Sequence, residues 1–274
     1  MSLSVNTNAG ALIALANLNN TAQQLQQAQN IVSTGLAVGS AKDNGAIFAI
    51  AQNERAQVSS LDAVKSSLQN GQSVIDVANS AGTTVSNLLT QAEQKALAAT
   101  DTSIDTASRT ALNNDYKALL SQITSTVNSA SFNGVNLLNG NQASITSLAD
   151  ASGSTLTTQA ENLTLSVGLG VTAALQTFST AAEAQSSLTA VQTALGTVDA
   201  ALASLGTSSN ALDTHLNFVS NLQDTLTTGI GNLVNADLAK ESATLQALQT
   251  KQQLGIQALS IANSGSSALL GLFR

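Results

Sequence analysis

The sequence predicts a mainly α-helical protein: an elongated coiled-coil rod of long antiparallel helices with a small β element, in which the N- and C-terminal helices pair. Three observations support this fold class. Apolar residues recur at alternating steps of three and four over most of the 274 residues, which is the spacing of a coiled-coil seam. The chain has no proline, a residue that costs about 3 kcal/mol in a helix interior. Strict apolar alternation, typical of a strand, occurs in one short stretch.

The first helix is predicted from an apolar seam near the N-terminus. One polar residue, Gln29, fills the gap in an otherwise regular three-four spacing. The apolar positions of this seam are Leu15, Leu18, Ala22, Leu25, Val32 and Leu36.

The second helix is predicted over about residues 44–98, where the register runs without a break from Ile47 to Ala92. Its imperfect slots hold Glu54, Gln57, Gly71 and Gly82. At 1.5 Å per residue, a helix of about 55 residues is about 80 Å long, which predicts an elongated molecule. By the same argument we expect further helices over about 104–129, 178–230 and 234–274.

A small β element is predicted within about residues 132–175, exposed at the surface. Asn133-Gly134 and Asn139-Gly140 are turn dipeptides. Beyond them, alternating apolar residues predict a strand with one buried face. Residues 141–162 are rich in Ser and Thr, so we expect them to be exposed. The alternating residues are Leu163, Leu165, Val167, Leu169 and Val171.

The composition excludes several classes of function. With 16 acidic and 9 basic residues and a net charge of −7, the chain lacks the basic patch of a nucleic-acid binder. The absence of cysteine and the single histidine, His215, argue against thiolate or paired-histidine metal sites, and we expect His215 to be a surface or rim residue. The apolar run near the start, Ala9–Ala16, is too short to span a membrane. We expect no cofactor, no metal and no catalytic constellation.

The low charge at both chain ends predicts self-assembly. The first 41 residues carry no charged side chain, and the last 40 carry few. Such surfaces do little to resist association, and their Gln, Asn and Thr side chains can hydrogen-bond across close helix contacts. If the contact is head-to-tail and does not close into a ring, the product is a helical filament. The composition alone also allows a monomeric or dimeric coiled-coil rod.

Short motifs at both ends resemble those of bacterial flagellins. At the N-terminal end they are Val5-Asn6-Thr7-Asn8, Leu18-Asn19-Asn20 and Ser40-Ala41-Lys42-Asp43-Asn44-Gly45-Ala46, followed by Phe132-Asn133-Gly134-Val135-Asn136-Leu137-Leu138. At the C-terminal end they are Asn235-Ala236-Asp237-Leu238-Ala239-Lys240-Glu241 and the final Leu270-Gly271-Leu272-Phe273-Arg274. The resemblance covers about residues 1–140 and 175–274, and the short middle resembles compact alphaproteobacterial members without large outer domains.

The resemblance implies a structural, non-enzymatic subunit that self-assembles into the extracellular flagellar filament after export through the type III apparatus. It implies that residues 1–42 and 232–274 form a channel-lining assembly domain, and that residues 43–231 form a helical rod with the β element at the filament surface. The expected assembly interface comprises Leu15, Leu18, Leu25, Val32, Leu36, Leu238, Leu245, Leu248 and Leu259.

The resemblance also carries over two short motifs, one at the junction between these layers and one acidic pair. Lys42, Asp43 and Asn44 form the inter-layer junction motif, in which an acid at Asp43 also suits a helix start. Asp237 and Glu241 match the family's acidic-pair motif, although Asn235 stands where the family has its first acid.

The resemblance also implies partners. They are other copies of this chain, with other flagellins as further possible subunits, together with an export chaperone, the filament cap and hook-junction proteins; we expect no membrane partner. In many flagellins an Arg-Glu-Leu cluster is recognised by the innate immune receptor. The matching stretch, Gln91-Ala92-Glu93-Gln94-Lys95, lacks the Arg and the Leu, so we expect weak or absent recognition. O-linked glycans on exposed Ser and Thr are also compatible with the family.

Two alternatives share some of these features. A hook–filament junction protein has similar terminal motifs but a small copy number. A secreted coiled-coil adhesin or needle-complex protein has similar helices but no role in motility. The match at Ser40 to Ala46 and the short middle favour a flagellin.

Overall fold

The computed structural model describes residues 8–271 and divides the chain into two compact units. Unit 1 combines the residues up to Ala56 with those from Thr225 onward, and unit 2 is Gln57–Asp224. In the described part, the elements in chain order are α1 (Ala9–Thr34), α2 (Gly45–Ala99), α3 (Thr106–Ser129), β1 (Ser144–Leu148), β2 (Thr155–Gln159), the short 3-10 helix η1 (Ala173–Leu175), α4 (Ala181–Val234) and α5 (Leu238–Gly271).

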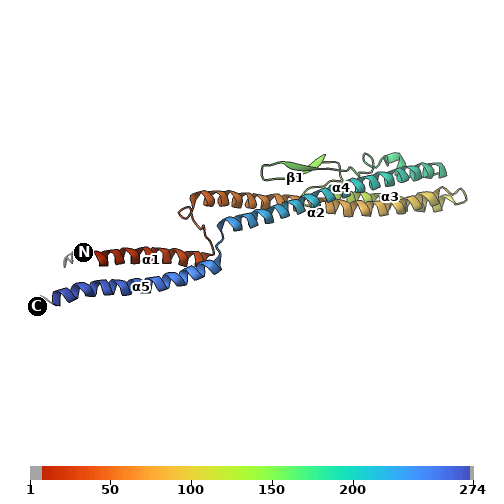
Figure 1. Cartoon of the computed structure of the whole chain (residues 1–274). Helices are drawn as coiled ribbons and strands as arrows, with labels where there is room; N and C mark the ends of the chain where they lie inside the picture. The colour runs from red at the N-terminus through yellow and green to blue at the C-terminus, as the bar shows by residue number, and fades with distance from the viewer. Residues whose placement is uncertain (1–7, 272–274) are drawn as a thin grey trace. The chain divides into compact units, whose positions relative to one another are not determined.

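The mainly helical fold class is confirmed, with long helices, one small sheet and contact between the two terminal helices (Figure 1). The 55 residues of α2 match the predicted length, and α4 has 54. Each of these helices contributes residues to both units.

The core of unit 2 is built on the heptad seam of α2. Its seam residues are buried at alternating steps of three and four throughout the unit, so one face of the helix is removed from water. The two glycines predicted as imperfect slots are also buried there, because other segments approach the helix closely at both points. These buried positions are Leu61, Val64, Leu68, Gly71, Ile75, Ala78, Gly82, Val85, Leu89, Ala92, Ala96 and Ala99.

Within unit 2, α4 runs antiparallel to α2. Three hydrogen bonds at the edge of the seam join the helices: Gln223 Nε2 donates to Asp62 Oδ1 at 2.6 Å, Gln72 Nε2 donates to Ser209 Oγ at 2.6 Å, and Gln192 Nε2 donates to Glu93 Oε1 at 2.9 Å. Residue numbers fall on α4 as they rise on α2, which defines the direction. Because each bond needs its own partner, the three together disfavour a slip in register.

The third helix, α3, is fixed to unit 2 by its aromatic residue. Tyr116 is fully buried, its ring lies 5.2 Å from that of Phe178, and its hydroxyl donates to the Leu175 carbonyl at 3.0 Å. Burial raises the pKa of Tyr116 to about 12, because the phenolate would lose its hydration. The start of α3 is capped by Asp105, whose Oδ1 accepts from the Ser108 N–H at 2.7 Å.

The β element differs from the predicted one. The two strands, β1 and β2, form an antiparallel hairpin inside the Ser/Thr-rich stretch, residues 141–162, for which the sequence predicts exposure. Ser147 and Thr158 are buried because the hairpin lies against α2, where the Leu148 N–H donates to Ser67 Oγ at 3.0 Å. The side chain of His215 contacts the hairpin as well, with Nε2 2.6 Å from the Ala149 carbonyl oxygen.

The strand predicted over residues 163–171 is wrong. Asn162 Oδ1 accepts from both the N–H and the hydroxyl of Thr164, which turns the chain back on itself. Gly168 then packs so closely on the Asn162 backbone that no side chain would fit. The apolar residues are buried irregularly in consequence: Leu163, Leu169 and Val171 are buried, whereas Val167 is 81% exposed.

Among the described helices, α4 has the length and mean hydropathy of a candidate membrane span. One third of its most apolar window is buried inside the protein. The apolar seam against α2 accounts for this composition, since a core helix meets the same criteria.

Candidate assembly interface

The first helix of unit 1, α1, is defined at both ends by its own side chains and backbone. Asn8 Oδ1 accepts from the Ala11 N–H at 3.0 Å and caps the start of the helix. At the other end Gly35 adopts φ 73°, and its N–H donates to the Ile31 carbonyl at 2.8 Å. Between these caps α1 carries no charged residue.

The expected acidic pair organises the start of α5. Asp237 Oδ1 accepts from the backbone N–H groups of Ala239 and Lys240, both at 3.1 Å, which makes it the N-cap. Glu241 lies in the first turn, where a negative charge is favoured by the exposed N–H groups of the helix. Both acids therefore have a local role in starting this helix.

The two terminal helices contact each other along their length (Figure 1). The half-buried positions of α5, from Glu241 to Ala262, repeat at steps of three and four, as those of α1 do. Gly255 lets the helices approach closely, because a Cβ there would lie 3.2 Å from Leu18 Cδ1. Asn8 Nδ2 also donates to the Ala262 carbonyl at 2.7 Å, which joins the start of α1 to α5.

Most of the predicted interface residues lie on this seam between α1 and α5. They are half-buried there by contact between the two helices of one chain: Leu18, Leu25, Val32, Leu245, Leu248 and Leu259. Leu15 and Leu238 are instead 44% and 48% exposed, on the outside of the pair. Leu36 lies beyond the end of α1.

A short antiparallel ladder joins the chain just after α1 to the chain just before α5. Leu36 pairs with Asn235, the N–H groups of Ala37 and Val38 donate to the Val234 carbonyl at 2.8 and 3.2 Å, and the Ala236 N–H donates to the Gly35 carbonyl at 2.9 Å. Because these backbone groups are paired, the ends of both terminal helices are held at one point of unit 1.

The junction motif forms a compact turn between this ladder and α2. Asp43 Oδ2 accepts from the Ser40 hydroxyl at 3.0 Å, the Ser40 N–H at 2.9 Å and the Gly39 N–H at 3.2 Å. These donors, the Ser40 hydroxyl first, hold the pKa of Asp43 below its usual range. Asn44 Oδ1 accepts from the Ile47 N–H at 3.2 Å and caps α2, whereas Lys42 is exposed.

Apart from Leu15 and Leu238, sequence reasoning missed the apolar residues that face outward on unit 1. Ile13 is 63% exposed on α1, and Ile261 is 72% exposed on α5. The three-four spacing identifies residues that contact a partner helix, but not the apolar residues that lie between those positions. The near absence of charge on these helices was the signal that could have indicated an outward apolar face. The outward-facing residues of α1 and α5 are Leu12, Ile13, Leu15, Leu238, Leu254, Ile256 and Ile261.

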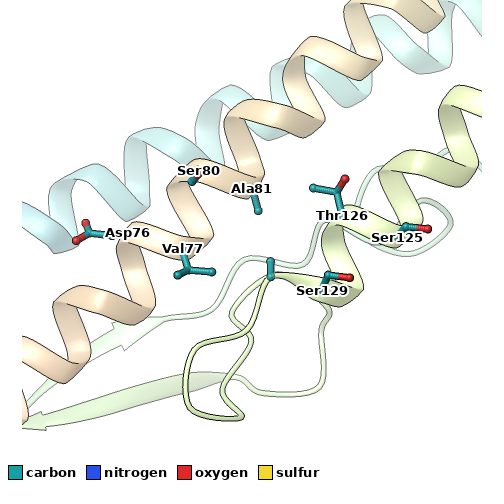
Figure 2. A pocket seen from close by; sticks show the side chains of 8 residues that line it. Asp76, Val77, Ser80, Ala81, Ser125, Thr126 and Ser129 are labelled. Carbon is teal, nitrogen blue, oxygen red and sulfur yellow. The ribbon is translucent and has the colours of Figure 1, made fainter.

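A depression of about 660 Å³ in unit 2 lies between α2 and the end of α3 (Figure 2). Its one charged residue, Asp76, lies at one end, away from the hydroxyl groups of Ser125, Thr126 and Ser129 on α3. Asp76 Oδ1 accepts from Gln72 Nε2 at 3.3 Å. The lining residues do not combine a nucleophile with a base and an oxyanion donor, so this depression is no active site.

The unusual geometry of unit 1, a charge-poor helix pair with apolar residues on its outer face, agrees with the family comparisons. The chain matches the bacterial flagellin N-terminal helical region over residues 5–143 and the C-terminal helical region over residues 188–273. It is therefore a protein of the flagellar axial structures.

More particularly, the chain belongs to the bacterial flagellin family. It is 59% identical to flagellin FljN and 56% identical to flagellin FljM of Caulobacter vibrioides, in each case over 99% of this chain and 98% of the relative. A flagellin of Brucella melitensis is 35% identical over 99% of both chains. The solved structure of a flagellar hook-associated protein from Vibrio parahaemolyticus covers 70% of this chain with a TM-score of 0.59 at 16% identity, so it shares the fold alone.

The expected identity is thereby confirmed, including its alphaproteobacterial character. The protein is a structural, non-enzymatic subunit of the extracellular flagellar filament, which serves motility. The hook–filament junction and adhesin alternatives are set aside, because flagellins match the chain over nearly its full length.

Proposed function

We propose that this flagellin polymerises through the outer faces of α1 and α5, after the seam between these helices has closed within each chain. In this proposal residues 1–42 and 232–274 are the assembly domain, and residues 43–231 are the rod with its exposed β element. Leu15 and Leu238 dock on other copies, whereas Leu18, Leu25 and Val32 with Leu245, Leu248 and Leu259 hold the pair in shape.

The exposure of the outer residues is the observation that carries this proposal. Seven Leu and Ile side chains of α1 and α5 are between 44% and 72% exposed. Full burial of one such side chain is worth about 1.5–3 kcal/mol, so their joint burial against neighbouring copies is a large driving force. No charge on α1 opposes it.

The backbone ladder and the junction motif have a separate role in the proposal. Leu36 and its pairing with Asn235 hold the two helix ends together. Lys42, Asp43 and Asn44 hold the turn into α2, and Asp237 and Glu241 define the start of α5. All of them shape the interface without forming its contact surface.

The proposal is tested by substituting the outward residues. We expect Ile13→Thr and Ile261→Thr to raise the protein concentration at which seeded filaments grow, because each removes apolar area that assembly buries. Val167→Thr is the matched control, since Val167 is 81% exposed but lies in unit 2. Growth is measured by sedimentation and electron microscopy, with monomer stability followed by circular dichroism.

Two outcomes would contradict the proposal. One is normal growth of both Thr variants, and the other is an equal loss in the Val167 control. Substitution of a seam residue such as Leu25 separates the two roles, because it should lower both the stability of the α1–α5 pair and assembly.

We further propose that the outer face of α5 binds an export chaperone before assembly, and that the filament cap and hook-junction proteins contact the assembled ends. The exposed Ile256 and Ile261 support a chaperone site, because an apolar helix face that is exposed on an unassembled subunit is a binding surface for another protein. Loss of chaperone binding in Ile256→Thr, with binding retained in Val167→Thr, tests this role.

We also propose that the innate flagellin receptor recognises this chain weakly. Beyond the missing Arg and Leu, the remaining charged side chains are engaged: Glu93 accepts from Gln192, and Lys95 forms a 2.8 Å ion pair with Asp115. A receptor-reporter cell response as strong as that to a flagellin carrying the Arg-Glu-Leu cluster would overturn this expectation.

A further inference from the structure

Four asparagines in the chain precede a glycine: Asn44, Asn70, Asn133 and Asn139. A backbone nitrogen can attack the side-chain amide carbon of the preceding asparagine to form a five-membered imide. Glycine is the least hindered neighbour for this attack because it has no Cβ. The four sites are similar in sequence, so the structure around each one decides its reactivity.

Two of the four side chains are held by hydrogen bonds. Asn44 Oδ1 accepts from the Ile47 N–H at 3.2 Å as the cap of α2. Asn139 Oδ1 accepts from the Asn141 N–H at 3.0 Å, and the following Gly140 is packed against the Asn162 side chain. An attack at either site must first break a hydrogen bond and move the side chain.

The third site lies inside a helix. Asn70 and Gly71 are in the middle of α2, where the backbone N–H groups are hydrogen-bonded to the preceding turn. Gly71 is also buried beneath Ser147 of the hairpin. The backbone nitrogen there cannot reach the Asn70 side chain unless the helix opens.

Asn133 is different in each of these respects. It is exposed, it has φ 49°, and its side chain makes no hydrogen bond within the described chain. A Cβ at Gly134 would meet no atom within 4 Å, so the attacking residue is unshielded. The turn is closed only by the two 2.9 Å hydrogen bonds between Phe132 and Val135.

We propose that Asn133 is a site of spontaneous deamidation. The Gly134 backbone nitrogen loses its proton to water and bonds to Cγ of Asn133, and the C–N bond to Nδ2 breaks as ammonia leaves. Water then opens either carbonyl of the resulting succinimide. The net reaction consumes one water, releases one ammonia and leaves aspartate or isoaspartate at position 133.

The product changes the surface next to the turn. Asn133 borders a groove of about 430 Å³ between α2, this turn and β1, and every residue that lines the groove is uncharged. The new carboxylate places a negative charge there. Isoaspartate also adds a methylene to the main chain between Phe132 and Val135, which breaks the pairing that closes the turn.

The test is incubation of the full purified chain in mildly alkaline buffer made with heavy-oxygen water, followed by peptide mapping. Chymotrypsin cleaves after Phe132 and Leu138, which separates Asn133 from Asn139. We expect heavy oxygen and isoaspartate at position 133 to accumulate about tenfold faster than at positions 44 and 139, since each of those must first break an ordinary hydrogen bond. Position 70 should react most slowly.

The same incubation in concentrated urea is the internal control. Unfolding exposes all four sites, so their rates should converge. Faster reaction of Asn133 in urea as well would show that neighbouring sequence, and not the turn, sets the order, and would overturn the structural assignment. Equal or faster reaction at Asn44, Asn70 or Asn139 in the folded chain would overturn it too.

A substitution separates the imide route from other sources of the product. Asn133→Gln keeps a neutral amide but would need a six-membered ring, so the modification at this position should disappear. Persistence of heavy-oxygen uptake at position 133 in this variant would contradict attack by Gly134. Asn133→Asp reports whether the added charge alone changes assembly, since it omits the longer backbone of isoaspartate.

Discussion

The two units have the same heptad spacing of apolar residues, but these residues are buried to very different degrees. In unit 2, Val85, Leu89 and Ala92 of α2 are fully buried by segments of the same chain. In unit 1, the seam residues Leu18 and Leu25 remain half-buried, and apolar neighbours such as Ile13 face outward. The difference teaches that a seam predicts a partner helix but not how many partner helices there are, because in the proposed assembly a second copy of the chain buries the outward apolar face.

The two units also differ in their net charge. The sequence places twelve acidic and four basic residues in unit 2, against four acidic and five basic residues in unit 1. Excess negative charge keeps copies of unit 2 apart, whereas unit 1 is nearly neutral. This distribution of charge supports the proposed association through the terminal helices.

The largest test of the contrast is one substitution made in both units. We expect Leu68→Ala, at a position 1% exposed, to lower the free energy of unfolding by about 2–5 kcal/mol through the lost contacts and the cavity. Leu15→Ala, at a position 44% exposed, should change it by no more than about 0.5 kcal/mol and impair filament growth instead. Urea unfolding of the monomer measures both, and equal losses would refute the contrast.

An intermediate effect is expected at alkaline pH, through Tyr116 of unit 2. The pKa of Tyr116 rises from 10.0 to about 12 on folding, so the unfolded chain ionises first as pH increases. The contribution of Tyr116 to stability is thus constant below pH 10 and falls between pH 10 and 12, by at most about 2.7 kcal/mol at 1.36 kcal/mol per pKa unit. Tyr116→Phe should be less stable at neutral pH but lose this step. If the free energy of unfolding falls equally steeply with pH in the variant and in the unmodified protein, Tyr116 is not the source of this step.

The smallest effect distinguishes a glycine that serves packing from one that does not. A Cβ at Gly71 would overlap Ser147 Oγ and lie 3.4 Å from Leu212 Cδ1, so Gly71→Ala should destabilise unit 2 by about 1–2 kcal/mol. Gly196 in α4 has no atom within 4 Å of such a Cβ, so Gly196→Ala should stabilise by up to about 1 kcal/mol. Thermal melts that shift in the same direction for both variants would contradict the packing role of Gly71.

The sequence predicts the long helices well because their signal is repeated many times. Residues such as Val64, Leu89, Val191 and Val198 report the same periodicity independently, so a polar slot such as Ser209 does not hide it. Even the glycine slots of α2 were informative, since both are buried at close approaches.

The hairpin and the conformation of residues 163–171 were not predicted, because they depend on single side chains. The hairpin strands are composed largely of Ser and Thr, whose burial comes from contact with α2 and leaves no alternation to read. The false strand over 163–171 has the right alternation, but the two hydrogen bonds from Thr164 to Asn162 bend the chain. At the candidate interface, the helix pair was predictable, whereas the outward residues Leu12, Ile256 and Ile261 were not, since they fall between the seams.

The hydrogen bond between Asp62 and Gln223 influences whether α1 pairs with α5 of its own chain or with α5 of another molecule. It holds α2 and α4 together near the two points where the chain leaves unit 2. Once unit 2 has folded, α1 and α5 are therefore tethered to a common base, and each meets its own partner at an effective concentration of order millimolar. A helix from another molecule at lower concentration competes poorly, so the fold protects each subunit against domain swapping before its outer face meets the next copy.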